Sequence, residues 1–353
     1  MFEDLIVIDC STVLAGPSVG TFFAELGADV TKIENPAIPD VTRSWKLASE
    51  GKDSPVSAYF SSVNYRKQYQ KIDFKEQSQL EQFIDLVKTA DILLSNFKKG
   101  DAEKFGISDA YLQSINPKLI IGKISGFGTE SDRVAYDLIL QAETGFMSMN
   151  GTPESGPVKM PVALIDVLAA HQLKEGILTA LLNRTKTRKG AVVSVSLYDA
   201  AIASLANQAS NYLMEGHIPK RIGSLHPNIA PYGEIFTTND GKLITFAIGS
   251  NKHFRLLCDF FGLSELPSDP RFSENVERVK NRTELQEIIA KISSRFNADD
   301  ILQFMHTHFV PAGLIKDLKQ VFEDSGAQSL VLTETIENLQ TKRVSQIAFQ
   351  LKP

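Results

Sequence analysis

Residues 5–34, LIVIDCSTVLAGPSVGTFFAELGADVTKIE, set the fold class of this chain. The apolar run at 5–9 predicts a strand, the residues up to Leu26 predict a helix that Gly27 closes, and residues 29–34 predict a second strand. A strand, helix, strand succession of this length is a βαβ unit, whose two strands lie parallel. The sequence therefore predicts an α/β protein built on a parallel sheet.

The turn after the first strand departs from the dinucleotide-binding pattern. GPSVG at 16–20 is not G-x-G-x-x-G, and Pro17 stands where a glycine would let the backbone approach a pyrophosphate. This turn therefore disfavours a nicotinamide or flavin enzyme.

Composition narrows the class of protein further. The chain has 353 residues, a formal net charge of -5 and 43% hydrophobic residues, which predicts two domains and supplies no broad basic face for nucleic acid. Cys10 and Cys258 lie far apart without metal-ligand spacing, which favours reduced thiols in a cytoplasmic protein. The first ten residues lack the features of a signal peptide, and no apolar run is long enough to span a bilayer.

A second stretch, PVALIDVLAAHQLKEGILTALLNRTKTRKGAVVSVSLYD at 161–199, places an acid at the start of a helix. Its apolar residues keep three-to-four spacing and predict one buried stripe: Leu168, Leu173, Ile177, Leu178, Leu181 and Leu182. A basic turn with Gly190 and a β-branched run at 192–195 predict a further strand. Asp166 fits an N-cap, the usual reason for Asp at such a place. The free N–H groups and partial positive charge of a helix start can also hold a carboxylate ionised.

Two more predicted strands end in polar turns. Helical spacing at 76–90 is followed by a strand at 91–95 and the turn NFKKG at 96–100. A strand at 118–125 is followed by a glycine turn at 126–128. Because ligands lie outside the carboxyl ends of the strands in an open parallel sheet, we expect a binding site at the turn 96–100.

The pattern changes after a predicted helix at 200–214. Asn239-Asp240-Gly241 between apolar runs predicts a hairpin, and therefore a small antiparallel unit. The expected divisions are a large domain at 1–205, a linker at 206–220, a small α+β domain at 221–305 and a segment at 306–353 that returns to the large domain.

These blocks, in this order, resemble the class III (CaiB/BaiF-type) CoA-transferases. The matching blocks are AGPSVGTFFAELGADVTKIENP from Ala15, the Asn96 turn, the Asp166 helix with GAVVSVSLYD from Gly190, GSLHPNIAPY from Gly223 and FVPAG from Phe309. The resemblance covers residues 5 to about 330 and fades after Leu332. It implies a Rossmann-like large domain that binds CoA, a smaller α+β domain and an interlocked homodimer.

The resemblance also implies roles for individual residues, with Asp166 as the nucleophile. The CoA contacts that it implies are Ala15, Gly16, Pro17, Lys32, Arg66, Lys67, Asn96, Phe97, Lys98, Lys104, Arg133 and Tyr136, and a loop over the substrate would include Gly223, Ser224 and His226. Arg66 and Lys67 fit a solvated basic face equally well. His226, beside a proline, also fits a hydrogen-bonded structural residue. One glycine in residues 223–227 does not predict a large lid motion.

The implied reaction moves CoA from an acyl-CoA to a free carboxylic acid through an aspartyl anhydride and an aspartyl-CoA thioester. CoA is the acyl carrier, and no metal is expected. Family members that racemise 2-methylacyl-CoA carry a histidine where Tyr136 stands, and a tyrosine, with a reference pKa of about 10, carries no proton near neutral pH. Transfer is therefore favoured over racemisation, with a non-catalytic CoA-binding protein as a third reading. Relatives continue with a G-x-H-T-x-x-x-L tail, so we expect a shortened C-terminus here. The sequence does not name the acids.

Overall fold

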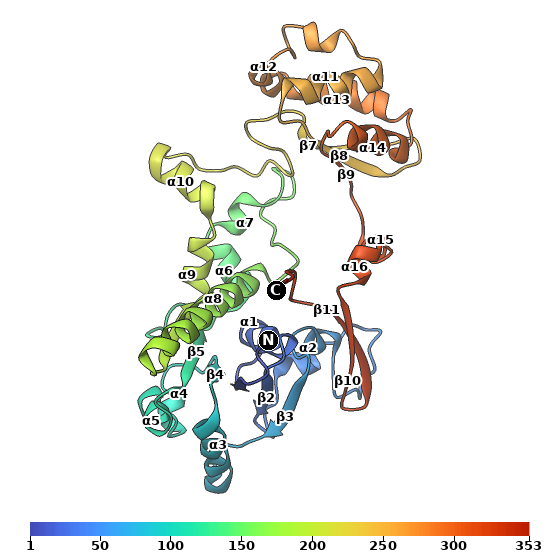
Figure 1. Ribbon diagram of the computed structural model, residues 1–353. Helices are drawn as coiled ribbons and strands as arrows, with labels where there is room; N and C mark the ends of the chain where they lie inside the picture. The colour runs from blue at the N-terminus through green and yellow to red at the C-terminus, as the bar shows by residue number, and fades with distance from the viewer. Residues whose placement is uncertain (353) are drawn as a thin grey trace. The chain divides into compact units, whose positions relative to one another are not determined.

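A computed structural model describes residues 1–352 (Figure 1). Their contacts form two compact units. Unit 1 consists of Met1–Met149, Val158–Pro219 and the residues from Ser329 onward, and unit 2 consists of Asn150–Pro157 and Lys220–Gln328. Unit 1 thus takes its residues from both ends of the chain. The boundaries differ from the expected 205 and 306 because the helix predicted at 200–214 stays in unit 1, and residues up to 328 stay in unit 2.

The core of unit 1 is a six-stranded parallel sheet, which confirms the predicted α/β class. Its strands run in the order β3-β2-β1-β4-β5-β6. They are β1 (Ile6–Asp9), β2 (Asp29–Glu34), β3 (Lys67–Lys71), β4 (Ile92–Ser95), β5 (Ile120–Ser125) and β6 (Ala191–Ser196). The strand order reverses between β1 and β4, which is the switch point where ligands of such sheets bind.

Helices pack against both faces of this sheet. Alternate strand residues point to opposite faces, so Val7 joins one buried cluster and Ile8 joins the other. The first cluster includes residues of α1 (Ala15–Glu25), α8 (Leu164–Thr187) and α9 (Leu197–Ala203), and the second includes residues of α3 (Gln77–Thr89) and α5 (Asp109–Ile115). The remaining helices of unit 1 are η1 (Val41–Ser44), α2 (Ala58–Ser62), α4 (Asp101–Lys104), α6 (Asp137–Glu143), α7 (Phe146–Met149) and α10 (Ala206–Glu215).

The buried stripe of α8 differs from the predicted one. Its buried residues are Ile165, Asp166, Ala169, Ala170, Leu173, Lys174, Ile177 and Ala180. Leu178 and Leu182 are instead 36% and 64% exposed. The prediction was wrong there because small alanines, rather than the leucines, let the helix approach α1 and the sheet closely.

Three further elements were not predicted correctly. Strand β3 is a short, polar edge strand, whose composition carries little hydrophobic signal. The helix predicted at 200–214 is two helices, α9 and α10, separated by residues 204 and 205, and the first residue of α10, Ala206, has φ 47°. Residues 331–344, where the family resemblance fades, form an antiparallel hairpin of β10 (Val331–Ile336) and β11 (Leu339–Val344).

That hairpin belongs to unit 1 and lies beside α2 (Figure 1). Arg343 forms an ion pair with Glu25 at the end of α1, and its Nε donates to the carbonyl of Ser62 in α2 at 3.0 Å. The last strand pair therefore fastens onto the N-terminal part of the same unit.

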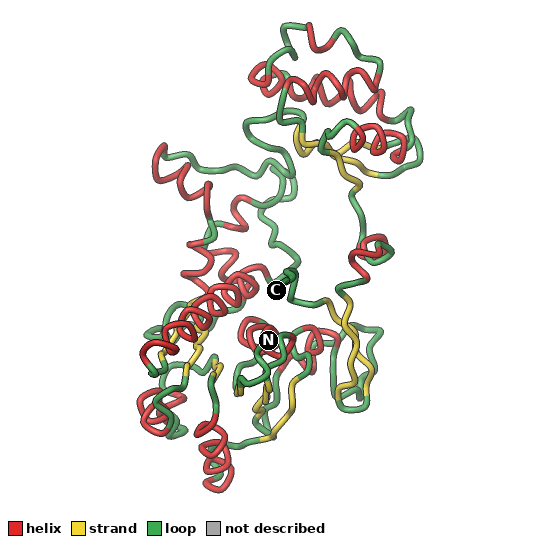
Figure 2. The backbone as a smooth tube through the Cα atoms, viewed as in Figure 1, coloured by secondary structure: helices red, strands yellow, loops and turns green. Residues whose placement is uncertain are grey.

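Unit 2 combines a small antiparallel sheet with helices, coloured yellow and red in Figure 2. The sheet order is β7-β8-β9, and Asn239-Asp240-Gly241 forms the predicted turn between β7 and β8. The elements are β7 (Tyr232–Thr237), β8 (Leu243–Ala247), α11 (Asn251–Phe261), η2 (Leu266–Ser268), α12 (Asn275–Lys280), α13 (Arg282–Ser293), α14 (Ala298–Thr307), β9 (Ala312–Leu314), α15 (Leu318–Val321) and α16 (Ser325–Gln328). Their core is rich in phenylalanine and holds α14 and β9 in this unit.

Within residues 1–352, no helix is long and apolar enough to cross a membrane.

Candidate active site

A cavity of about 900 Å³ opens in unit 1 at the carboxyl ends of the sheet strands. Its walls come from the loops after β1, β4 and β5, together with the start of α8. The first two loops flank the switch point, where the sequence predicted a ligand. Its volume falls within the range of small-molecule sites.

Asp166 lines this cavity from the first turn of α8. It is not the N-cap, since that position is Ala163, which provides no side-chain cap. The first-turn N–H of Ile165 is instead bound by Asp137 Oδ1 at 2.8 Å. The N-cap reading of Asp166 is therefore wrong, and its carboxylate is left without a capping role.

The Asp166 residue is 8% exposed, and its carboxyl group accepts no hydrogen bond from any of residues 1–352. Burial, and secondarily the negative charge of Asp137, raises its pKa to about 7. Burial thus outweighs the helix start, which was expected to keep this acid ionised. A raised pKa in a cavity is typical of catalytic carboxyl groups.

Two aromatic residues that the sequence did not single out, Trp45 and Tyr59, lie near this acid and near the predicted Tyr136. Trp45 contacts Tyr59 edge-on, with ring centroids 5.1 Å apart, and lies 6.3 Å from the ring of Tyr136. Burial, and then the charges of Asp166 and Asp137, raise the pKa of Tyr59 to about 12, so its hydroxyl stays a hydrogen-bond donor at neutral pH.

Basic side chains gather around the same cavity. Lys98, Lys99 and Lys104 follow β4, Lys123 lies on β5, and Arg133 lies in the loop before α6. Most are paired: Lys99 with Glu130, Lys104 with Asp101, Lys123 with Asp109 and Arg133 with Glu143. Lys98 forms no ion pair within residues 1–352 and is therefore open to an anionic ligand.

Comparison with known proteins identifies the family. A model of "CoA-transferase family III" matches residues 2–352. The chain belongs to CoA-transferase family III. The predicted resemblance is confirmed, and the match extends beyond Leu332, so the C-terminal hairpin is part of the family fold.

Named relatives of this family III chain are CoA-transferases, which confirms the predicted enzyme class. It is 36% identical to a succinate–glutarate CoA-transferase of Agrobacterium fabrum, over 94% of this chain and 84% of the relative. It is 35% identical to an acetyl-CoA:oxalate CoA-transferase of Acetobacter aceti, over 90% and 82%. Among solved structures, a CaiB/BaiF family protein from Brucella suis is 34% identical with a TM-score of 0.85, covering 98% of this chain and 91% of the other.

The structure brings together eight of the predicted site residues of this CoA-transferase. The cavity is lined by Ala15, Asn96, Phe97, Lys98, Lys104, Arg133, Tyr136 and Asp166. The Asn96 side chain is occupied within the protein, because its Oδ1 accepts the N–H of Thr12 and its Nδ2 donates to the carbonyl of Thr12. Phe97 packs its ring against Phe74 and Phe105. Both residues therefore shape the cavity wall.

Five other predicted CoA contacts do not line the cavity. Lys32 and Lys67 have fully buried side chains, paired with Asp40 at 3.1 Å and Asp9 at 2.8 Å. Gly16 and Pro17 lie inside α1, where a Cβ at Gly16 would come within 2.3 Å of Ser11 Cβ. Arg66 precedes β3, and its backbone N–H is bound by Glu334 of the C-terminal hairpin at 3.0 Å. Because the Lys67 side chain is fully buried, it belongs neither to a solvated basic face nor to a phosphate contact, the two roles that the sequence left open.

The predicted substrate loop lies in unit 2 and is bonded to its neighbours. The Gly223 N–H donates to Gly151 O at 2.8 Å, and the Ser224 hydroxyl donates to Gly233 O at 2.5 Å. Nδ1 of His226 accepts the N–H of Asn228 at 3.1 Å, which is the hydrogen-bonded structural role.

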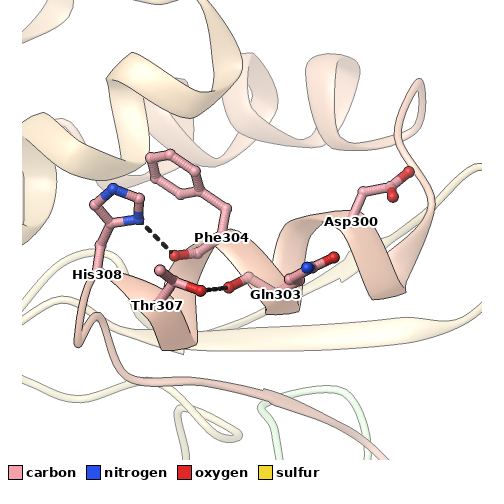
Figure 3. A pocket seen from close by; sticks show the side chains of 5 residues that line it. All are labelled: Asp300, Gln303, Phe304, Thr307 and His308. Carbon is pink, nitrogen blue, oxygen red and sulfur yellow. Dashed lines mark hydrogen bonds between the residues drawn. The ribbon is translucent and has the colours of Figure 1, made fainter.

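A second depression of about 290 Å³ in unit 2 follows one face of α14 (Figure 3). Its polar contacts stay within the helix, such as the hydrogen bond between His308 Nδ1 and Phe304 O at 2.9 Å. Figure 3 shows no side chains converging on a common point, so it carries no site in our interpretation. Within residues 1–352, no group of three or more His, Cys, Asp or Glu residues could hold a metal.

Proposed function

We propose that this chain transfers CoA from an acyl-CoA to a free carboxylic acid, with Asp166 as the nucleophile. The carrying observation is the position of its carboxyl group: in the wall of the switch-point cavity, nearly buried, and free of hydrogen bonds within residues 1–352. A carboxylate stripped of solvent in this way is a stronger nucleophile than one in water.

The proposed reaction has four steps. Asp166 attacks the donor thioester carbonyl, the C–S bond breaks, and a mixed anhydride and CoA thiolate result. The thiolate attacks the aspartyl carbonyl, which releases the donor acid and leaves an aspartyl-CoA thioester. The acceptor carboxylate attacks that thioester and forms a second anhydride with release of the thiolate. The thiolate then attacks the acceptor's acyl carbonyl, giving the new acyl-CoA and free Asp166.

The names of the relatives suggest the acids. Because the chain resembles succinate–glutarate and acetyl-CoA:oxalate enzymes, we propose short dicarboxylic acids as substrates. Tyr59, whose pKa responds to the charge of Asp166, and Tyr136, which lines the same cavity as Asp166, supply hydroxyl groups that can donate hydrogen bonds to such a carboxylate.

We further propose a homodimer in the cytoplasm. Exposed apolar side chains on α8 and α10 support a second copy as partner: Leu182, Tyr212, Leu213 and Met214 are 64%, 54%, 79% and 78% exposed. The buried free thiols of Cys10 and Cys258 support a reducing compartment. Light scattering tests the dimer, and a purely monomeric protein would contradict it.

The decisive experiment compares variants of two aspartates that line the same cavity, Asp166 and Asp132. Asp166→Ala should lower kcat with succinyl-CoA and glutarate by at least about 10³-fold, whereas Asp132→Ala, in the same cavity lining, should stay within about fivefold. Hydroxylamine added to donor-loaded enzyme should label Asp166, as seen by peptide mass spectrometry. Label on another residue would reject the assignment.

The two other readings have their own signatures. Deuterium uptake at the α-carbon of a 2-methylacyl-CoA would indicate a racemase. Tight CoA binding without any product in a screen of acyl-CoA donors and carboxylic acids would indicate a non-catalytic protein.

A further inference from the structure

The loop between β1 and α1 contains a backbone conformation that its sequence does not favour. Val13 has φ 74°, in the left-handed region that a β-branched residue rarely adopts. Such a conformation persists only where the surroundings impose it, and it is often found where a binding surface is built. Val13 lies in that kind of surface, since Thr12, Val13, Leu14 and Ala15 line the cavity.

A buried ion pair holds this conformation from one side. The N–H of Val13 donates to both carboxylate oxygens of Asp40, each at 3.3 Å. Nζ of Lys32 lies 3.1 Å from Asp40 Oδ2 and donates to the carbonyl of Ser11 at 2.7 Å. The side chains of Lys32 and Asp40 are fully buried, so neither reaches a ligand itself.

Asn96 holds the loop from the other side of the switch point. Its Oδ1 accepts the N–H of Thr12 at 3.1 Å, and its Nδ2 donates to the carbonyl of the same residue at 3.0 Å. The backbones of three consecutive residues, 11–13, are therefore hydrogen-bonded to three side chains. Lys32 lies on β2, Asp40 follows β2 and Asn96 follows β4. Only the outward face of the loop remains for a ligand.

We propose that Asp40, supported by Lys32, is a positioning residue that holds Val13 in its left-handed conformation and so preforms the CoA-binding wall. This inference rests on the proposed function, because it takes CoA as the ligand of the cavity. Without the acceptor at position 40, Val13 returns to an ordinary conformation, and CoA must reorder the loop on binding. The apparent dissociation constant of CoA then equals the intrinsic one divided by the fraction of molecules in which the loop has the binding conformation, so it rises as that fraction falls.

The experiment removes the ion pair as a unit, since removing one partner leaves a buried charge uncompensated. Lys32→Met/Asp40→Leu lacks both the charges and the acceptor, whereas Lys32→Met/Asp40→Asn lacks the charges but keeps an acceptor oxygen. Calorimetry with CoA should give a dissociation constant about tenfold higher than wild type for the leucine variant and within about threefold for the asparagine variant. Asp40→Ala replaces Asp40→Leu if the latter does not fold.

Glycine at position 13 separates positioning from stability. Asp40 also caps η1 through the N–H of Thr42, and loss of that cap would lower the melting temperature of the leucine variant without involving Val13. Because glycine adopts φ near 74° freely, Val13→Gly should restore most of the affinity that the leucine variant loses. With glycine at position 13, the Lys32→Met/Asp40→Leu change should alter the dissociation constant of CoA by less than about threefold, compared with Val13→Gly alone. The melting temperature of the leucine variant that also carries Val13→Gly should stay below that of the wild-type protein, because the cap of η1 is still missing.

Two results would overturn the inference alone: equal CoA affinity in the leucine and asparagine variants, or no rescue by Val13→Gly. Failure of the wild-type protein to bind CoA would reject the proposed site itself, and this inference with it. The binding readout does not depend on Asp166, so inactivity of the enzyme leaves the result interpretable.

Discussion

Asp137 Oδ1 accepts a hydrogen bond from the backbone N–H of Ile165 at 2.8 Å. A carboxylate from α6 therefore caps the first turn of α8, in which Asp166 directly follows Ile165. Its other oxygen accepts Gln141 Nε2 at 2.6 Å. The charge that caps the helix also adds to the effect of burial on Asp166, whose pKa is about 7. Asp137 therefore fixes the position of the acid and makes it harder to ionise.

The pH dependence of the reaction should report this coupling. Because attack requires the ionised carboxylate, kcat/KM should rise with pH and level off above a midpoint near 7. Asp137→Asn keeps an oxygen for the Ile165 N–H but removes the charge, so the midpoint should fall by roughly one pH unit. Initial rates measured from pH 5 to 9 test this.

A matched control for that profile is Asp132→Asn. Asp132 lines the same cavity but does not contribute to the raised pKa of Asp166. Its midpoint should match wild type. An unchanged midpoint in Asp137→Asn would show that the charge of Asp137 does not act on the reacting acid.

Asp166 should also make the protein less stable as pH rises. Its pKa in the folded state, about 7, lies above the ordinary 3.8, so the unfolded chain ionises first. Between these values the unfolded state is favoured increasingly with pH, and above 7 the penalty is constant. At 1.36 kcal/mol per pKa unit, Asp166→Asn should raise the free energy of unfolding by up to about 4 kcal/mol at pH 8. Urea unfolding should show no such gain near pH 3.5, and a gain independent of pH would contradict the linkage.

The second buried ion pair near the sheet should matter for stability rather than for the ligand. Lys67 Nζ contacts Asp9 at 2.8 Å and also donates to Pro17 O and Val63 O. Lys67→Met leaves the Asp9 charge buried without its partner and should cost about 3–5 kcal/mol. The exposed pair Lys88–Asp85 provides the control, since Lys88→Met should leave the free energy of unfolding nearly unchanged. Urea denaturation at pH 7 distinguishes them, and equal losses would contradict the role of burial.

The parts of the site that the sequence predicted are those encoded locally. The strands before Asn96 and Gly126 show as apolar runs, and a parallel sheet brings their ends together. The position of Asp166 at a helix start is visible in one stretch of sequence, whereas its role as a nucleophile was predicted from the family resemblance. The motif around Ser196 and Asp199 proves to be a local cap, in which the Ser196 hydroxyl accepts the N–H of Asp199 at 2.9 Å.

The residues that were misplaced or missed depend on partners distant in the sequence. Lys67 looks like a surface lysine until the fold places Asp9, 58 positions earlier, against it. Trp45 and Tyr59 lie at the two ends of a loop without periodicity, so nothing local indicates that their rings meet.

The lysines after β4 give the last prediction, because CoA carries several phosphate groups. Lys98 and Lys104 line the cavity, whereas Lys88 on α3 does not. Charge reversal by Lys98→Glu or Lys104→Glu should raise the dissociation constant of CoA by about 3–10-fold at 20 mM salt, with the larger effect at Lys98, which has no ion-pair partner within residues 1–352. Lys88→Glu should leave it unchanged. The difference should shrink at about 0.5 M salt, where exposed charges are screened. Calorimetric titration at both salt concentrations tests this, and equal effects of all three reversals would mean that net charge, rather than this cavity, attracts CoA.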